Sequence, residues 1–148
     1  MKVLVVGAGA MGHAIAELAA IYGNEVYLVD IKKEILDQAI SNIKWSLEQL
    51  KSKNVIKNEE EILNRIYSTT NLASVSGNAD LVIEAIVENL DIKKKLYEDL
   101  DKLCREDAII ASNTSSIPIS KLAEATKRPS KVAGLHFFNP PLLIRFVE

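Results

Sequence analysis

The first thirty residues constrain the fold of this chain more than any other segment. An apolar run over residues 2–6 leads into Gly7-Ala8-Gly9-Ala10-Met11-Gly12, a helical pattern follows, and a second apolar run over residues 25–29 stops at Asp30. This order is typical of a strand, a tight turn, a helix and a second strand. In such a turn the first glycine permits the bend, the second lets a pyrophosphate approach the backbone, and the third lets helix and strand pack closely. The segment therefore predicts a dinucleotide site with phosphates at the helix N-terminus, the alternative being an ordinary glycine-rich turn.

Asp30 bears on which dinucleotide such a site prefers. Its place at the end of the second strand lets a carboxylate hydrogen-bond the 2′-hydroxyl of an adenosine ribose. The same charge repels a 2′-phosphate, which favours NAD over NADP. Lys32 and Lys33 follow closely and soften that preference.

Composition narrows the remaining classes. A chain of 148 residues with 48% apolar and 26% charged residues is ordinary for one globular domain. The formal net charge of −2 provides no basic footprint for nucleic acid. Cys104 is the only cysteine, which excludes a disulfide framework and favours a reducing compartment. Residues 3–22 superficially resemble a secretory signal, but three glycines, His13 and Glu17 interrupt them, so we expect neither export nor a membrane span. We also expect no metal site.

The rest of the chain alternates short apolar runs with helical patterns, which predicts βαβ units and an α/β fold with a doubly wound, mostly parallel sheet. The expected helices run from after Asp30 to 53 and over 58–64, 90–104 and 119–126, and the expected strands over 67–71, 80–86, 107–112 and 131–136. Ligands of such sheets bind beyond the carboxyl ends of the strands. The residues at those ends are therefore the candidates for chemistry.

Two strand ends carry polar runs whose simplest role is helix capping. Asn89 follows Val87-Glu88 and is expected to cap the next helix. In the run 113–116, a hydroxyl is expected to cap the helix beyond Pro118.

His136 closes the expected strand 131–136 and has a potential partner in Glu148. Residues 142–148 are predicted to return as an antiparallel strand, and a turn centred on residue 142 would place the two side chains opposite each other. A carboxylate facing a histidine would orient the ring and stabilise its charged form. The alternatives are a structural histidine and a merely terminal charge.

Together these motifs resemble the L-3-hydroxyacyl-CoA dehydrogenase family, which includes the 3-hydroxybutyryl-CoA dehydrogenases. The resemblance covers essentially the whole chain, in order and at similar spacing. It rests on five stretches: the fingerprint 7–12, Asp30, the run 80–89, the run 111–116, and the run 136–140 with Val147-Glu148. It implies a Rossmann-type fold, NAD as cofactor, an acyl-CoA substrate, and hydride transfer at C3 of a 3-hydroxyacyl thioester.

The resemblance also implies residue roles. His136 matches the catalytic base, Glu148 its carboxylate partner, and Ser115 the hydroxyl that binds the substrate oxygen beside the nicotinamide. The cofactor-binding positions implied are Gly7, Ala8, Gly9, Ala10, Met11, Gly12, Asp30, Glu88, Lys93, Ser115 and Asn139. Ser46 and Lys53 fall where the family's second helix touches coenzyme A, and their seven-residue spacing puts them on one helix face. A solvated helix face is the alternative for that pair.

Family members continue into a helical second domain that completes the substrate site and forms a homodimer interface, and nothing in residues 1–148 corresponds to it. We therefore expect these residues to be the NAD-binding domain of a truncated, cytoplasmic enzyme that associates through the bared surface. Two other functions stay open: a sugar-acid or 3-hydroxy-acid dehydrogenase on the same scaffold, and a non-catalytic NAD(H) sensor.

Overall fold

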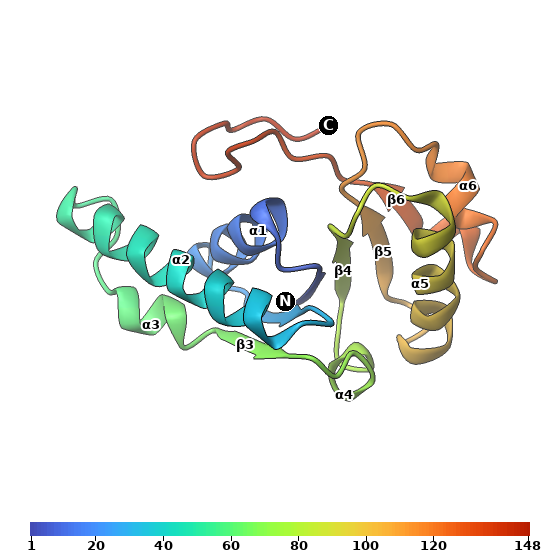
Figure 1. Ribbon diagram of the computed structural model, residues 1–148, viewed down its shortest axis with the longest axis horizontal. Helices are drawn as coiled ribbons and strands as arrows, with labels where there is room; N and C mark the ends of the chain where they lie inside the picture. The colour runs from blue at the N-terminus through green and yellow to red at the C-terminus, as the bar shows by residue number, and fades with distance from the viewer.

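The computed structural model describes all 148 residues and contains one six-stranded parallel sheet with helices on both faces (Figure 1). The strand order is β3-β2-β1-β4-β5-β6. The strands are β1 (Lys2–Val6), β2 (Glu25–Val29), β3 (Ile66–Thr69), β4 (Leu81–Glu84), β5 (Ile109–Ser112) and β6 (Val132–Gly134). The helices are α1 (Ala10–Ile21), α2 (Lys33–Ser52), α3 (Glu59–Leu63), α4 (Ala73–Ser76), α5 (Leu90–Leu103) and α6 (Ile119–Ala123), with a 3₁₀ turn at Pro129–Lys131.

Each face of the sheet carries its own hydrophobic core. Val3 and Val5 of β1 point into a core shared with α1, α2 and α3, whereas Leu4 and Val6 point into a core shared with α5 and α6. Successive side chains of a strand alternate between faces, so a strand covered on both sides needs a continuous apolar run. That requirement explains the composition of residues 2–6. The chain reverses its direction of winding between β1 and β4, and ligands of doubly wound sheets bind at such a switch point.

The doubly wound parallel sheet is confirmed, and most expected elements are present with slightly narrower bounds. The sequence did not predict α4 or the 3₁₀ turn, whose three to four residues are too few to show a helical period. The expected antiparallel strand over 142–148 is wrong. Only one isolated antiparallel bridge joins Phe137 to Val147, and the segment between them, rich in proline at its start, forms no strand.

The two capping predictions have different outcomes. Asn89 is the N-cap of α5, because its Oδ1 accepts the backbone N–H of Ile92 at 3.0 Å. The hydroxyl of Thr114 instead accepts the N–H groups of Ser116 and Ile117, in the turn before Pro118. No side chain caps α6, so the predicted hydroxyl cap of that helix is wrong.

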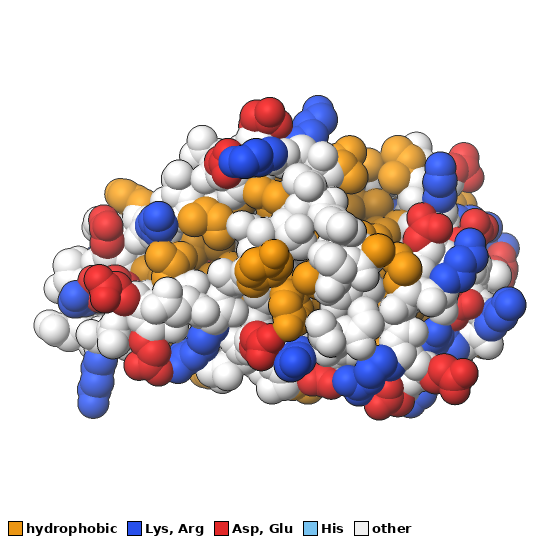
Figure 2. All heavy atoms as spheres, turned by 90° about the horizontal axis from the view of Figure 1, so that it is seen from below, with side chains coloured by type: hydrophobic (Ala, Val, Ile, Leu, Met, Phe, Trp, Pro, Cys, Tyr) orange, Lys and Arg blue, Asp and Glu red, His pale blue; other side chains and the backbone are white.

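The surface carries both signs of charge. On the face opposite the C-terminal segment, acidic and basic side chains are interspersed around a central group of hydrophobic ones (Figure 2).

Cys104, the C-cap residue of α5, is buried, and burial raises the pKa of its thiol to about 11. No helix has the length and apolarity that crossing a membrane requires.

Candidate active site

The glycine-rich loop has the geometry that close approach of a ligand requires. Gly7 has a φ of +99°, and a Cβ there would lie 2.5 Å from the carbonyl oxygen of Ala85. A Cβ on Gly12 would lie 1.7 Å from the oxygen of Gly7, so only glycine lets α1 pack on this loop. Around Gly9 nothing lies within 4 Å of the Cβ position. The middle glycine therefore faces open space beside the free N–H groups at the start of α1, which fits a pyrophosphate.

Asp30 is connected to the same loop. Its Oδ2 accepts the backbone N–H of Ala8 at 2.9 Å, and its Oδ1 accepts that of Lys32 at 3.1 Å. Each carboxylate oxygen has a second lone pair, so both remain able to accept a ribose hydroxyl. Lys33 is paired with Asp37 at 2.6 Å, one turn along α2, and so is already engaged by a carboxylate.

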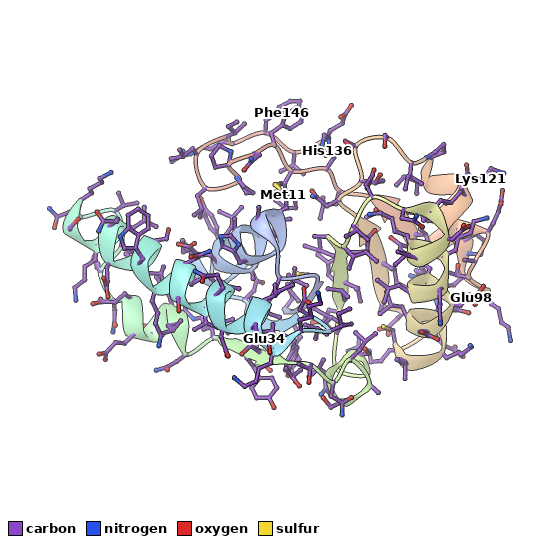
Figure 3. The ribbon with its side chains drawn as sticks, viewed as in Figure 1. Met11, Glu34, Glu98, Lys121, His136 and Phe146 are labelled. Atoms are coloured by element: carbon purple, nitrogen blue, oxygen red, sulfur yellow. The ribbon has the colours of Figure 1, made fainter.

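A hollow of about 330 Å³ lies at the carboxyl ends of β4 and β5, beside the start of α1. It brings together segments far apart in the sequence, and Figure 3 shows Met11 at the tip of α1 beneath His136. Its lining residues are Met11, Ala85, Ile86, Glu88, Lys93, Asn113, Ser115, His136, Phe137, Phe138 and Asn139. Six of them are residues to which the family resemblance assigns a role: Met11, Glu88, Lys93, Ser115, His136 and Asn139.

A larger hollow, about 610 Å³, lies away from this chemistry. Its lining includes Met1, Lys2 and Asp80 at the amino ends of β1 and β4, and Arg105 pairs there with Asp80 at 3.0 Å. Ligands of doubly wound sheets bind at the opposite ends of the strands. We therefore assign the site to the smaller hollow.

His136 and Glu148 lie side by side. Their backbones exchange two hydrogen bonds of 2.9 Å, and Nδ1 of His136 lies 3.4 Å from Oε2 of Glu148. The imidazole is mostly buried and packs against Phe138, with the two rings tilted and their centroids 4.8 Å apart, whereas the Glu148 carboxylate is 75% exposed. The contact of Nδ1 with the carboxylate leaves Nε2 free for proton transfer.

Asn113 holds the backbone next to His136 in place. Its side-chain oxygen accepts the backbone N–H of Phe137 at 2.8 Å, and its backbone N–H donates to the backbone carbonyl oxygen of Glu84 at 2.8 Å. The loop that carries the histidine is thereby tied to the ends of both β4 and β5. The sequence pattern did not identify Asn113 as functional, because a polar residue after a strand is equally typical of a turn.

Glu88 is the most strongly held carboxylate of the hollow. It accepts hydrogen bonds from the hydroxyls of Thr114 and Ser116, the second at 2.9 Å, and lies 3.2 Å from the ammonium of Lys93. Partial burial opposes its ionisation, but these donors outweigh burial and lower its pKa to about 2. Glu88 is therefore a fixed anion at neutral pH, suited to accept hydroxyl donors from a ligand.

The stability of the fold is expected to depend on Glu88 and on pH. A carboxyl whose pKa is lowered in the folded state stabilises that state above its unfolded pKa, near 4.5, and the contribution is lost as pH falls toward 2. Because the side chain is 40% exposed, solvent screening reduces the effect, and we expect Glu88→Gln to cost about 1 kcal/mol at pH 7. Urea denaturation at pH 7 and at pH 3 measures this. An equal difference between the two proteins at both pH values would contradict it.

Lys93 lies deeper than its expected role suggests. It is 1% exposed, and its Nζ lies 2.6 Å from Oε1 of Glu84 as well as 3.2 Å from Glu88. The ammonium forms part of the floor of the hollow rather than extending from a helix surface. Direct contact of Lys93 with a cofactor stays a prediction, and its structural partners are two carboxylates.

Ser46 and Lys53 do not line the hollow. Ser46 is half-buried and lies near Glu17 of α1, a fully buried acid whose Oε1 has no partner. Burial raises the pKa of Glu17 to about 7, and the contact with Ser46 moderates the rise. Lys53 is exposed at the C-cap of α2. Their contact with coenzyme A stays a prediction.

Comparison with known proteins decides the family. Residues 2–148 match the family model described as the 3-hydroxyacyl-CoA dehydrogenase NAD binding domain. The chain belongs to this family. Its matched region includes the glycine-rich loop, Asp30 and every residue of the hollow, so the NAD-binding assignment and the geometry agree.

Relatives with this domain are similar along the entire chain. The mitochondrial hydroxyacyl-coenzyme A dehydrogenase of Sus scrofa is 45% identical over 99% of this chain, and the 3-hydroxybutyryl-CoA dehydrogenase of Clostridioides difficile is 41% identical over 100%. The crystal structure of 3-hydroxybutyryl-CoA dehydrogenase from Escherichia coli superposes with a TM-score of 0.96, at 40% identity. The superposition covers 99% of this chain and 31% of the Escherichia coli chain. The chain spans about half the length of the two curated relatives, 49% and 53%.

Proposed function

We propose that the protein containing this domain interconverts L-3-hydroxyacyl-CoA and 3-ketoacyl-CoA with NAD. The observation that carries the proposal is the hollow at the sheet's switch point, where His136, Ser115 and Glu88 converge beside the glycine-rich loop. NAD, when bound, supplies the hydride acceptor. The residues Gly7–Gly12 and Asp30 would hold its pyrophosphate and adenosine ribose, and Glu88 the hydroxyls of the second ribose.

His136 is suited to move the substrate proton. In the oxidising direction Nε2 takes the proton of the C3 hydroxyl, and in the reducing direction it returns that proton to the ketone oxygen. Glu148, 3.4 Å from Nδ1, stabilises the charged ring and holds its orientation. The exposed hydroxyl of Ser115 lines the same hollow and donates to the reacting oxygen.

The test follows NADH absorbance with acetoacetyl-CoA, with NADPH and free acetoacetate as controls. NADH oxidation that depends on the thioester is the expected result. Oxidation with free acetoacetate but not with the thioester would overturn the substrate assignment in favour of a 3-hydroxy-acid or sugar-acid dehydrogenase. NADH binding without turnover of either compound, in the intact protein, would favour a non-catalytic sensor.

Asp30 is expected to set the cofactor preference. Asp30→Asn keeps an oxygen for the N–H of Ala8 but removes the charge, so we expect NADH to bind about tenfold more weakly and NADPH no more weakly than before. Fluorescence titration with both nucleotides measures the ratio. Asp107→Asn, an exposed change of equal charge just before the amino end of β5, is the matched control and should leave both affinities within twofold. An unchanged ratio in Asp30→Asn would remove Asp30 from cofactor discrimination.

We infer a cytoplasmic, homodimeric enzyme acting on an acyl-CoA. The free thiol of Cys104 supports a reducing compartment, and the family resemblance supports the dimer and the thioester. Exposed apolar side chains near the C-terminus, among them Leu143 and Phe146, support association of the isolated chain. Light scattering at high concentration tests the association, and a monodisperse monomer would contradict it.

A further inference from the structure

Glu88 belongs to a charge cluster whose two buried members, Glu84 and Lys93, the proposed mechanism does not use. It consists of Glu84 at the end of β4, Lys93 of α5, and Glu88 itself. Glu84 is 0% exposed and Lys93 1%, whereas Glu88 reaches the hollow. Burying ions is costly unless they are paired and hydrogen-bonded, so the partners of these side chains decide which of them carry a charge.

The hydrogen-bond pattern establishes the charge of Glu84. Its Oε1 accepts from Nζ of Lys93 at 2.6 Å and from the N–H of Ile86 at 2.9 Å, and its Oε2 accepts from the hydroxyl of Ser112 at 2.7 Å. Three donors and no acceptor are the partners of an ionised carboxylate. Tyr97, nearby, adds no charge, because burial and the Glu84 carboxylate raise the pKa of its hydroxyl well above the usual range.

The cluster therefore has two anions and one cation. Its net charge is −1. Lys93 contacts both carboxylates and lines the same hollow as Glu88. A fixed negative charge in a poorly solvated position favours a cationic ligand over a neutral one of the same shape. The oxidised nicotinamide ring is cationic and the reduced ring is neutral, while the rest of the two cofactor forms is identical.

We propose that Glu84 is a positioning residue that biases the site toward the oxidised, cationic cofactor, acting through Lys93 and Glu88. Glu84 keeps the ammonium from neutralising Glu88 fully, because it binds the same Nζ at the shorter distance. The inference rests on the proposed function only in placing the nicotinamide in the hollow. It assigns to a residue that touches no ligand a specific effect on the ratio of two affinities.

The test measures dissociation constants of the chain itself for NADH, by fluorescence titration, and for NAD⁺, by competition. Glu84→Gln is expected to raise the ratio Kd(NAD⁺)/Kd(NADH) about sixfold, the size that Coulomb's law gives for a unit charge roughly 15 Å away at an effective dielectric constant of about 20. Glu98→Gln removes the same charge from the outer surface of α5 and should leave the ratio within about 1.5-fold (Figure 3).

Further variants keep the result decisive. Glu88→Gln alters a side chain that is 40% exposed, so folding is less at risk, and it should move the ratio in the same direction, since lost ribose contacts weaken both forms equally. Lys93→Met should move the ratio the other way. Equal weakening of both cofactor forms in Glu84→Gln would overturn the inference. A shifted ratio in Glu98→Gln would also overturn it. If Glu84→Gln does not fold, an unchanged ratio in Glu88→Gln overturns it.

The same titrations separate this inference from the proposed reaction. A shifted ratio in a protein that does not turn over acetoacetyl-CoA would support the charge cluster and contradict only the substrate assignment. A wild-type chain that binds neither NAD⁺ nor NADH would overturn both.

Discussion

Replacing His136 with glutamine is expected to lower kcat about 1,000-fold in the intact protein, with NADH affinity within twofold of the wild type. Positioned general acid–base catalysis contributes about 10²–10⁴ in rate, and glutamine fills a similar volume without accepting and releasing a proton. His136 is assigned only the substrate proton and no contact with the cofactor, which is why NADH binding should be spared. Steady-state kinetics with acetoacetyl-CoA, together with NADH titration, separate the two effects.

Two further variants serve as comparisons for that result. Glu148→Gln should cost less, about tenfold, because a carboxylate that is 75% exposed and 3.4 Å from Nδ1 stabilises the charged ring only partly. Lys121→Gln, an exposed change on α6, should leave kcat within twofold (Figure 3). A His136→Gln variant that keeps more than a tenth of wild-type kcat would exclude His136 as the proton-transfer group.

Replacing Gly12 with alanine is expected to destabilise the fold by about 3 kcal/mol, a fall in Tm of roughly 10 °C. The added Cβ would lie 1.7 Å from the Gly7 oxygen, and because the obstacle is backbone, the loop and α1 must move apart. The intrinsic helix preference of alanine over glycine, about 1 kcal/mol, is too small to compensate. Thermal unfolding followed by circular dichroism measures the change.

Gly9→Ala is the matched control, since nothing lies within 4 Å of its Cβ position. We expect its Tm to stay within about 2 °C of the wild type while NADH binds more weakly, because the added methyl group occupies the space a pyrophosphate needs. Equal Tm values for the two variants would contradict the structural distinction between the glycines.

Local pattern carried much of the fold prediction. The strands Lys2–Val6 and Glu25–Val29 and the helix between them follow from apolar periodicity and glycine placement, which act within a few residues. The same local rules failed at residues 142–148, where an apolar run suggested a strand. Strand formation there needs a hydrogen-bonding neighbour along its length, and the loop after His136 provides only one bridge.

Candidate site residues were predictable where a motif is contiguous, as in Gly7–Gly12 and Asp30, and where a strand end is readable, as at His136. Asn113 and Glu84 were not identified, because their roles consist of contacts with residues distant in sequence. The signal that could have identified Glu84, an acid within an otherwise apolar strand, was not used; an acid is almost never fully buried without a partner.

The sequence by itself determined the order of elements, the dinucleotide-binding turn and the family, because these depend on spacing within short segments. Only the tertiary structure decided that Lys93 is buried between Glu84 and Glu88. An alternating-charge helix is compatible with Lys93 in solvent, and the choice depends on how α5 packs against β4 and β5. The energy of a charge is set by its burial and its partners, which exist only once distant segments have come together.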